Sequence, residues 1–221
     1  MRTIILASGS PRRSAILTEL GFIFDTYLHD FDETSLDHLP PAERVVALAR
    51  AKARNALPAA GTREALIIGA DTLVCEPAPP SPEARAFADA SGAITLSKPA
   101  DKDAAELMLR ILSSRTHQVH TGLVVLNSSN GREESALSTS FVRFAPLSDR
   151  EIEAYLDSGE WEGVAGAYRV QGLAALFIEE IKGSWSGIVG LPIRELYAIF
   201  NRLSIETPAL LPGKFPPFGA R

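Results

Sequence analysis

Cysteine is nearly absent from this 221-residue chain, with Cys75 as its one example. A single cysteine excludes an intramolecular disulfide and a metal site built only from cysteines, and it suits a reducing compartment. The sequence has no run of about 18 apolar residues and so predicts no membrane span. Polar residues at 8–13 interrupt the N-terminal apolar stretch that a signal peptide would need. We therefore expect a cytoplasmic protein.

Positive charge is also scarce, because 22 lysines and arginines stand against 27 acidic residues, a net charge of -5. This balance argues against a general nucleic-acid-binding surface, so any anion binding must be local. Hydrophobic residues make up 46% of the chain and charged residues 22%, which is ordinary for a globular protein. The length fits one large domain or two small lobes.

The first turn of the chain is its most informative stretch. A short β-branched segment at residues 3–6 predicts a buried strand, and it leads into Ala7-Ser8-Gly9-Ser10-Pro11-Arg12-Arg13. Ser10 is placed as an N-cap and Pro11 as the first residue of a helix. Backbone N–H groups and the positive end of the helix dipole there favour an anion. The alternative is an ordinary turn with solvated arginines.

The next candidate residues lie in an acidic segment and in the helix after it. Glu33 belongs to the segment at residues 30–34, which is either a solvated loop or the source of a metal-binding carboxylate. The helix predicted from Pro40-Pro41 to about Leu57 has an apolar stripe on which position 52 falls. That residue is Lys52, and a buried ammonium needs an anionic partner unless it snorkels to the surface.

Three arginines of the same predicted helix, at positions 44, 50 and 54, are expected on its other faces. The continuous apolar run at residues 65–70 then predicts a central strand, with Asp71 and Thr72 at its carboxyl end. Ligands of open α/β sheets gather beyond such ends. Asp71 is thus a catalytic or metal-binding candidate, and the alternative is a turn or cap residue.

Residues 76–93 predict a proline-rich inserted loop with a short helix, after which the chain returns to Lys98. Further elements follow: a helix after residue 101, strands at 116–126 and near 141–144, a capping-box helix from Ser148, a strand near 177–181 and a last helix to about 203. The proline-rich tail at 207–221 has no periodicity.

Together these candidates suit a phosphate-handling enzyme. The cations are Arg12, Arg13, Lys52 and Lys98, and the carboxylates are Glu33 and Asp71, with Gln171 among glycines. Carboxylates next to phosphates are the usual setting of a magnesium-type ion, which takes oxygen ligands. Hydrolysis at phosphorus also needs a base and cations that absorb developing charge.

The motifs at these positions resemble those of the Maf family, the septum-formation-inhibitor-like nucleoside triphosphate pyrophosphatases. The resemblance runs from about residue 3 to 203 through Ser8-Gly9-Ser10-Pro11-Arg12-Arg13, Gly69-Ala70-Asp71-Thr72, Lys98-Pro99, His120-Thr121-Gly122, Gly159-Glu160-Trp161, Ala165-Gly166-Ala167-Tyr168, Gln171-Gly172 and Val189-Gly190-Leu191-Pro192. It implies one α/β domain over residues 1–206, with a mixed twisted sheet in two lobes around a cleft, as in inosine-triphosphate pyrophosphatases. It also implies a possible homodimer.

The resemblance implies a role for each candidate residue. Asp71 matches the general base and, with Glu33, the carboxylates that hold a divalent cation, magnesium or manganese. Lys52, Lys98 and Arg13 match cations on the phosphates, and Ser8 matches a substrate-binding residue. Arg12, Thr72 and Gln171 match the positions that select the base in the branch acting on dTTP and UTP. A glutamine amide both donates and accepts, which fits the edge of uracil or thymine.

Two departures from the family pattern bear on this expectation. The insertion at residues 76–93 lies between Asp71 and Lys98, so a displaced Lys98 would lose its role. Val164 stands where the family commonly has lysine. The resemblance extends the expected dTTP and UTP substrates to modified pyrimidine nucleotides. Two other functions stay open: the same chemistry on 7-methyl-GTP or another noncanonical nucleotide, and a nucleotide-binding regulator of cell division without catalysis.

Overall fold

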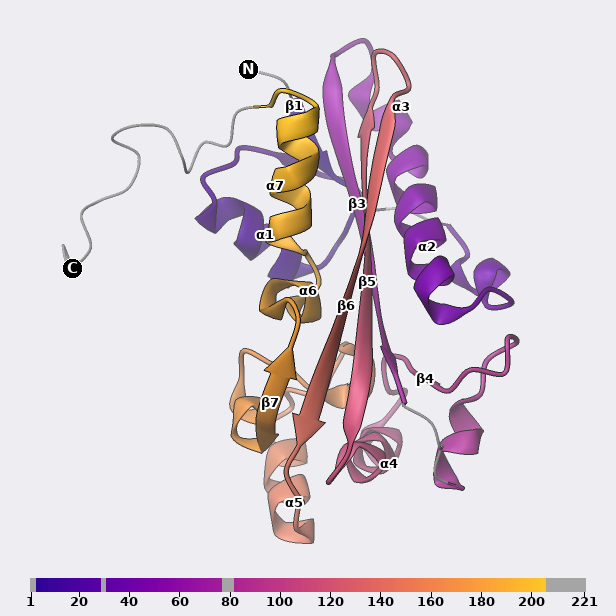
Figure 1. Ribbon diagram of the computed structural model, residues 1–221, viewed down its shortest axis with the longest axis vertical. Helices are drawn as coiled ribbons and strands as arrows, with labels where there is room; N and C mark the ends of the chain where they lie inside the picture. The colour runs from indigo at the N-terminus through magenta and orange to yellow at the C-terminus, as the bar shows by residue number, and fades with distance from the viewer. Residues whose placement is uncertain (1–2, 29–30, 77–81, 206–221) are drawn as a thin grey trace, which may run out of the picture.

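A single mixed β-sheet runs through the molecule (Figure 1). The computed structural model describes residues 3–28, 31–76 and 82–205. The strand order is β2-β1-β3-β5-β6-β7, with β4 paired to β3. β1 is parallel to both of its neighbours, and every other pairing is antiparallel. The strands are β1 (Thr3–Leu6), β2 (Asp25–Thr26), β3 (Ala65–Cys75), β4 (Thr95–Leu96), β5 (Thr116–Asn127), β6 (Glu133–Phe144) and β7 (Ile178–Lys182).

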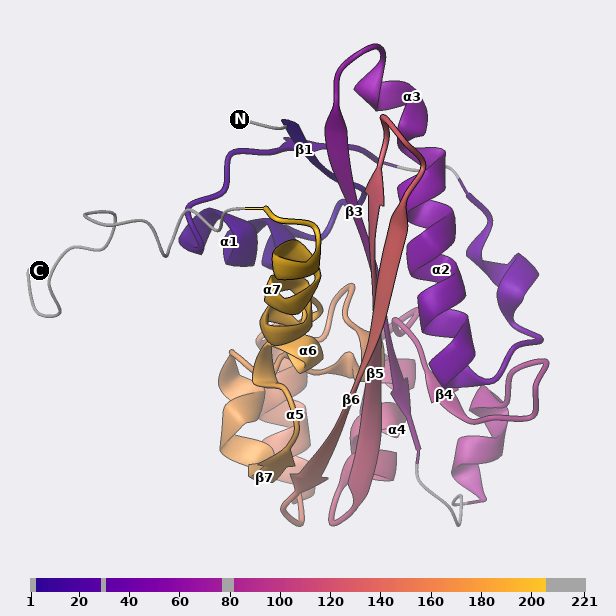
Figure 2. The same ribbon diagram turned by 45° about the horizontal axis from the view of Figure 1, so that its top comes forward.

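Helices cover both faces of this sheet. Figures 1 and 2 show α2 and α3 on one side of the long strands, and α1, α6 and α7 on the other. The helices are α1 (Pro11–Glu19), α2 (Pro41–Asn55), α3 (Leu57–Ala60), α4 (Lys102–Leu112), α5 (Asp149–Asp157), α6 (Trp185–Val189) and α7 (Ile193–Arg202). Short 3-10 turns are η1 (Glu33–Leu36), η2 (Glu83–Phe87), η3 (Ala165–Ala167) and η4 (Leu173–Phe177). The predicted mixed α/β fold class is confirmed.

Side chains of β3 alternate between these two layers, as the period of a strand requires. Ala65 and Ile67 share a buried cluster with alanines of α2. Leu66 and Ile68 instead belong to the large core on the opposite face. The same alternation turns the side chain of Asp71 toward α2 and that of the next residue toward α1 and α6. β3 thus delivers polar groups to both sides of the sheet.

Two glycines let α2 lie unusually close to the sheet. A Cβ added at Gly69 of β3 would come within 2.1 Å of the carbonyl oxygen of Ala49. A Cβ at Gly122 of β5 would come within 2.2 Å of the carbonyl oxygen of Val45. Gly122 pairs directly with Asp71. The absence of these two Cβ atoms brings the helix down to the level at which its side chains reach Asp71.

The edge of β3 is interrupted at the same place. β1 pairs with β3 only as far as Leu6 opposite Ile68, and β4 begins its pairing with Leu96 opposite Val74. Between these two pairings the edge of β3 faces a cleft. The turn after β1 and the residues after β4 therefore border this cleft from its two ends.

Several sequence predictions need correction. The strand predicted at residues 65–70 does not end at Asp71 but continues as β3 to Cys75. The strand near 141–144 is much longer, and α6 was not predicted. α4 begins as expected after Asp101, and α5 has its capping box. Residue 30 of the predicted acidic segment, residues 77–81 of the inserted loop and the tail at 207–221 lie outside the described residues.

Among the residues that the structure describes, no helix has the length and apolar character that crossing a bilayer requires.

Candidate active site

A cleft of about 650 Å³ opens beside the free edge of β3. Its walls come from the turn after β1, η1, α2, β3, the segment around β4 and residues 163–171. All nine residues predicted for the site line it: Ser8, Arg12, Arg13, Glu33, Lys52, Asp71, Thr72, Lys98 and Gln171. The fold thus gathers side chains that are up to 163 positions apart in sequence, from Ser8 to Gln171.

Lys52 lies between two carboxylates at the base of this cleft. Its Nζ is 2.6 Å from Oδ1 of Asp71 and 2.8 Å from Oε1 of Glu33. The Lys52 side chain is only 6% exposed, so the ammonium does not snorkel to solvent. An ammonium at this depth needs such partners, because an unpaired buried charge is costly. The geometry orients the Asp71 carboxylate, while the Glu33 side chain remains 46% exposed on the rim of the cleft.

Arg13 organises the opposite side of the strand. Its Nε donates to the carbonyl of Gly190 at 2.7 Å, Nη1 to Oγ of Ser8 at 3.0 Å, and Nη2 to Oγ1 of Thr72 at 3.2 Å. The hydroxyl of Thr72 is also 2.9 Å from that of Thr121. Burial lowers the pKa of the Arg13 guanidinium, and the charges of nearby carboxylates oppose that effect. Arg13 therefore fixes the turn after β1 and adds a positive charge to the cleft.

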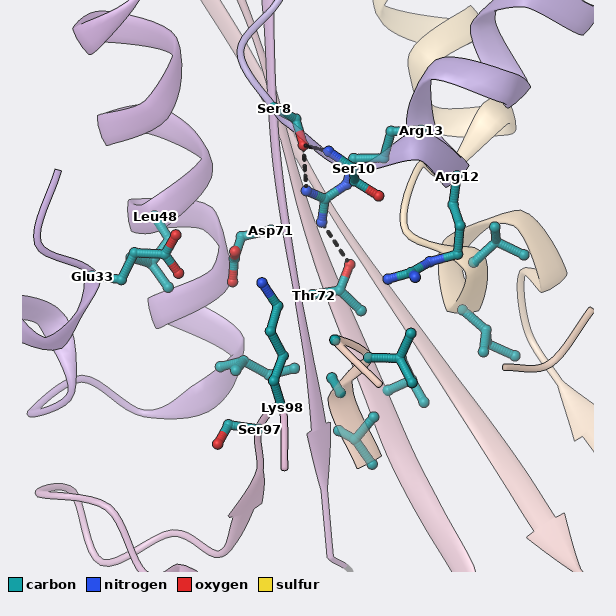
Figure 3. A pocket seen from close by; sticks show the side chains of 18 of the residues that line it. Ser8, Ser10, Arg12, Arg13, Glu33, Leu48, Asp71, Thr72, Ser97 and Lys98 are labelled. Atoms are coloured by element: carbon teal, nitrogen blue, oxygen red, sulfur yellow. Dashed lines mark hydrogen bonds between the residues drawn. The ribbon is translucent and has the colours of Figure 1, made fainter. Parts of the chain in front are cut away.

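The remaining cations lie on different walls. Figure 3 shows the Lys98 side chain pointing toward Asp71, and Arg12 entering from the side opposite Glu33. The insertion therefore does not remove Lys98 from the cleft. Arg12 is partly buried, and burial together with the charges of Arg13 and Arg169 lowers its pKa. An anion placed among these groups would relieve their mutual repulsion.

Sequence reasoning missed four charged residues that line the same cleft: Asp37, Arg44, Asp89 and Arg169. Arg44 was expected on an outer face of its helix, but its side chain is 3% exposed. The signal was present, because 44, 48 and 52 differ by steps of four and so lie along one face. Arg169 donates from Nη2 to the carbonyl of Glu162, and its Nε is buried without a partner among the described residues. It adds a cation near the position where Val164 lacks one.

The carboxylates suit a hard divalent cation that arrives with phosphates. Within the described ranges, no group of three His, Cys, Asp or Glu side chains gathers around one point. Glu33 and Asp71 together offer two carboxylates. Magnesium-type ions commonly take one or two carboxylates from the protein and their other ligands from substrate phosphates and water. The residues present therefore fit such an ion together with a polyphosphate.

Comparison with known proteins assigns the family. The profile described as Maf-like protein matches residues 3–203. The chain belongs to the Maf family. A dTTP/UTP pyrophosphatase of Treponema denticola is 43% identical over 205 residues, which cover 91% of this chain and 97% of the relative. A dTTP/UTP pyrophosphatase of Moorella thermoacetica is also 43% identical over 205 residues, covering 91% and 96%.

Among solved structures, a HAM1 protein from Coxiella burnetii aligns with a TM-score of 0.47 and 16% sequence identity. That alignment covers 91% of this chain and 100% of the other. A likeness at this level supports no conclusion about the site, so the family assignment rests on the sequence comparisons.

Proposed function

We propose that this chain is a nucleoside triphosphate pyrophosphatase that hydrolyses dTTP and UTP to the monophosphate and pyrophosphate. The observation that carries the proposal is Lys52 held between Asp71 and Glu33 in a cleft whose other walls present cations. The dTTP/UTP pyrophosphatases of Treponema denticola and Moorella thermoacetica, each 43% identical over nearly their whole length, support the substrate class.

In this proposal the side chains of the cleft divide the work, and Asp71 has two tasks. Asp71 accepts the proton of the attacking water, and Lys52 orients the Asp71 carboxylate. Arg13 and Lys98 bind the phosphates and absorb the charge that develops on them in the transition state. Magnesium or manganese, held by Glu33 and Asp71, supplies Lewis-acid stabilisation of the same charge when bound.

Base selection is assigned to Arg12, Thr72 and Gln171, which line the cleft. The Thr72 hydroxyl already bonds to Arg13 and Thr121. Gln171 is exposed and keeps an amide that can both donate and accept. We therefore assign most of the recognition of the pyrimidine edge to Gln171. The cytoplasmic location and the homodimer stay predictions.

The reaction type is tested by incubating the protein with UTP and magnesium and measuring pyrophosphate and orthophosphate separately. The proposal expects equal amounts of UMP and pyrophosphate, with no orthophosphate. Orthophosphate with UDP would mean that the terminal phosphate is removed instead. Bound nucleotide without either product would favour a regulator that lacks catalysis.

Gln171→Ala is expected to damage selectivity more than phosphate chemistry. Losing an amide that reads a hydrogen-bonding edge should reduce the preference for UTP over CTP by about 10-fold or more. The measurement is kcat/KM for each nucleotide in the wild type and the variant. An equal loss on every nucleotide would argue against a role for Gln171 in reading the base.

A further inference from the structure

Arg44 joins two segments that border the cleft. Its Nη1 lies 3.0 Å from Oδ1 of Asp37 and 3.1 Å from Oδ2 of Asp89. The Arg44 and Asp89 side chains are 3% and 6% exposed, whereas that of Asp37 is 43% exposed. One buried guanidinium therefore holds one carboxylate from the η1 segment and one from the segment before β4.

The η1 turn is attached to α2 at both of its ends. Glu33 is its first residue and pairs with Lys52, while Asp37 directly follows its last residue and pairs with Arg44. Lys52 and Arg44 are two helical turns apart on the same face of α2, with Leu48 between them. The second attachment restricts how far Glu33 can move away from the cleft.

Asp89 is itself held firmly. Its Oδ1 accepts from the backbone N–H of Ser91 at 2.9 Å and of Ala93 at 3.1 Å. Oδ2 is thereby left to face Arg44, and the Thr95 hydroxyl approaches it at 3.4 Å. Thr95 begins β4, which leads directly to Lys98. The position of Arg44 is therefore set by the same segment that carries a phosphate-binding lysine.

We propose that Arg44 is a positioning residue which, through Asp37 and Asp89, holds Glu33 in place to bind the divalent cation. This inference rests on the proposed function of Glu33 as a metal-binding carboxylate. Under this proposal, charged residues that do not themselves bind the ion set the affinity of the site for it. One of them, Asp89, comes from the inserted segment. Partners that orient a ligating carboxylate commonly change metal affinity when they are removed.

Asp37→Asn is the most informative variant. Asp37 is partly exposed, and without its charge the buried carboxylate of Asp89 still pairs with Arg44. The magnesium concentration for half-maximal UTP hydrolysis is expected to rise about 10-fold. The kcat at saturating magnesium should stay close to that of the wild type. Arg44→Lys, which keeps the charge but cannot reach both carboxylates equally well, should give a smaller rise. A purely structural role would lower the melting temperature without moving the magnesium dependence.

Arg50→Met is the matched control. Arg50 lies on the same helix and pairs with Glu133, away from the cleft. Its loss should leave the magnesium dependence unchanged. If Asp37→Asn and Arg44→Lys also leave it unchanged in an active enzyme, the proposal is wrong.

Metal binding measured without turnover tests the role of Arg44 independently of the proposed pyrophosphatase activity. Manganese binding is followed by electron paramagnetic resonance with the α,β-imido analogue of UTP present. Weaker manganese binding in Asp37→Asn, but not in Arg50→Met, is expected even if the wild type released no pyrophosphate. Identical manganese binding in all three proteins would overturn the role of Arg44, whereas a wild type inactive on UTP would overturn only the proposed function.

Discussion

Asp71→Asn should lower kcat for UTP by about 10²–10⁴-fold, the usual contribution of a general base. Asparagine has nearly the same shape, and its carbonyl oxygen can still accept from Lys52 Nζ, which retains Glu33 as a second partner. The amide cannot take a proton from water. The loss should therefore appear in single-turnover rates, while binding of the α,β-imido analogue of UTP is largely kept.

The control for this variant is Asp157→Asn. Asp157 forms an exposed ion pair with Lys102, neither residue lines the cleft, and exposed pairs contribute little to stability. It should retain wild-type kcat. Full activity in Asp71→Asn would remove Asp71 from the role of base, and a loss of nucleotide binding equal to the loss of rate would make its role one of binding.

Gly69→Ala should both destabilise the protein and reduce its activity. The added Cβ would lie 2.1 Å from the Ala49 carbonyl oxygen, so α2 must move away from β3. Overpacking of this kind commonly costs about 1–3 kcal/mol of unfolding free energy. Moving α2 also moves Lys52 relative to Asp71, and a misplacement of about 1 Å can cost 10²-fold in rate. Denaturant unfolding and kcat for UTP measure the two effects.

Gly131→Ala provides the comparison, since no atom lies within 4 Å of a Cβ added there and only its φ of 69° opposes the substitution. It is expected to cost about 1–2 kcal/mol, a destabilisation comparable with that of Gly69→Ala, because alanine is strained in the left-handed region, and to leave kcat unchanged. Wild-type kcat in Gly69→Ala would show that the close approach of α2 serves packing alone and does not set the Lys52–Asp71 geometry.

Local patterns in the sequence predicted Lys52 correctly but missed Arg44. Lys52 stood out because a lysine interrupted an otherwise apolar stripe. Arg44 lies on the same face, but an arginine in the first turns of a helix is usually solvated, and its partners Asp37 and Asp89 are separate from it in sequence. The spacing of 44, 48 and 52 indicates the shared face, but no periodicity identifies the partners Asp37 and Asp89 that hold Arg44 there.

The turn after β1 was also predicted well, because Ser10 and Pro11 carry local rules for starting a helix. The position of Asp71 was predicted less accurately. Its strand continues to Cys75, and the cleft exists because β1 stops opposite Ile68. Which strand neighbours β3, and where that neighbour ends, depends on long-range pairing that a single strand's sequence does not encode. The predicted residues line one cleft, but the gap in the sheet that exposes them was not predicted.

The assignment of this cleft to pyrimidine nucleotides can be tested by measuring kcat/KM for pyrophosphate release from UTP, dTTP, CTP, GTP and 7-methyl-GTP at saturating magnesium. We expect kcat/KM for UTP and dTTP to exceed that for every other nucleotide by at least about 10-fold, since a hydrogen-bonding site leaves groups unpaired when the wrong base binds. A purine nucleotide hydrolysed as well as UTP would contradict the assignment of this cleft to pyrimidines.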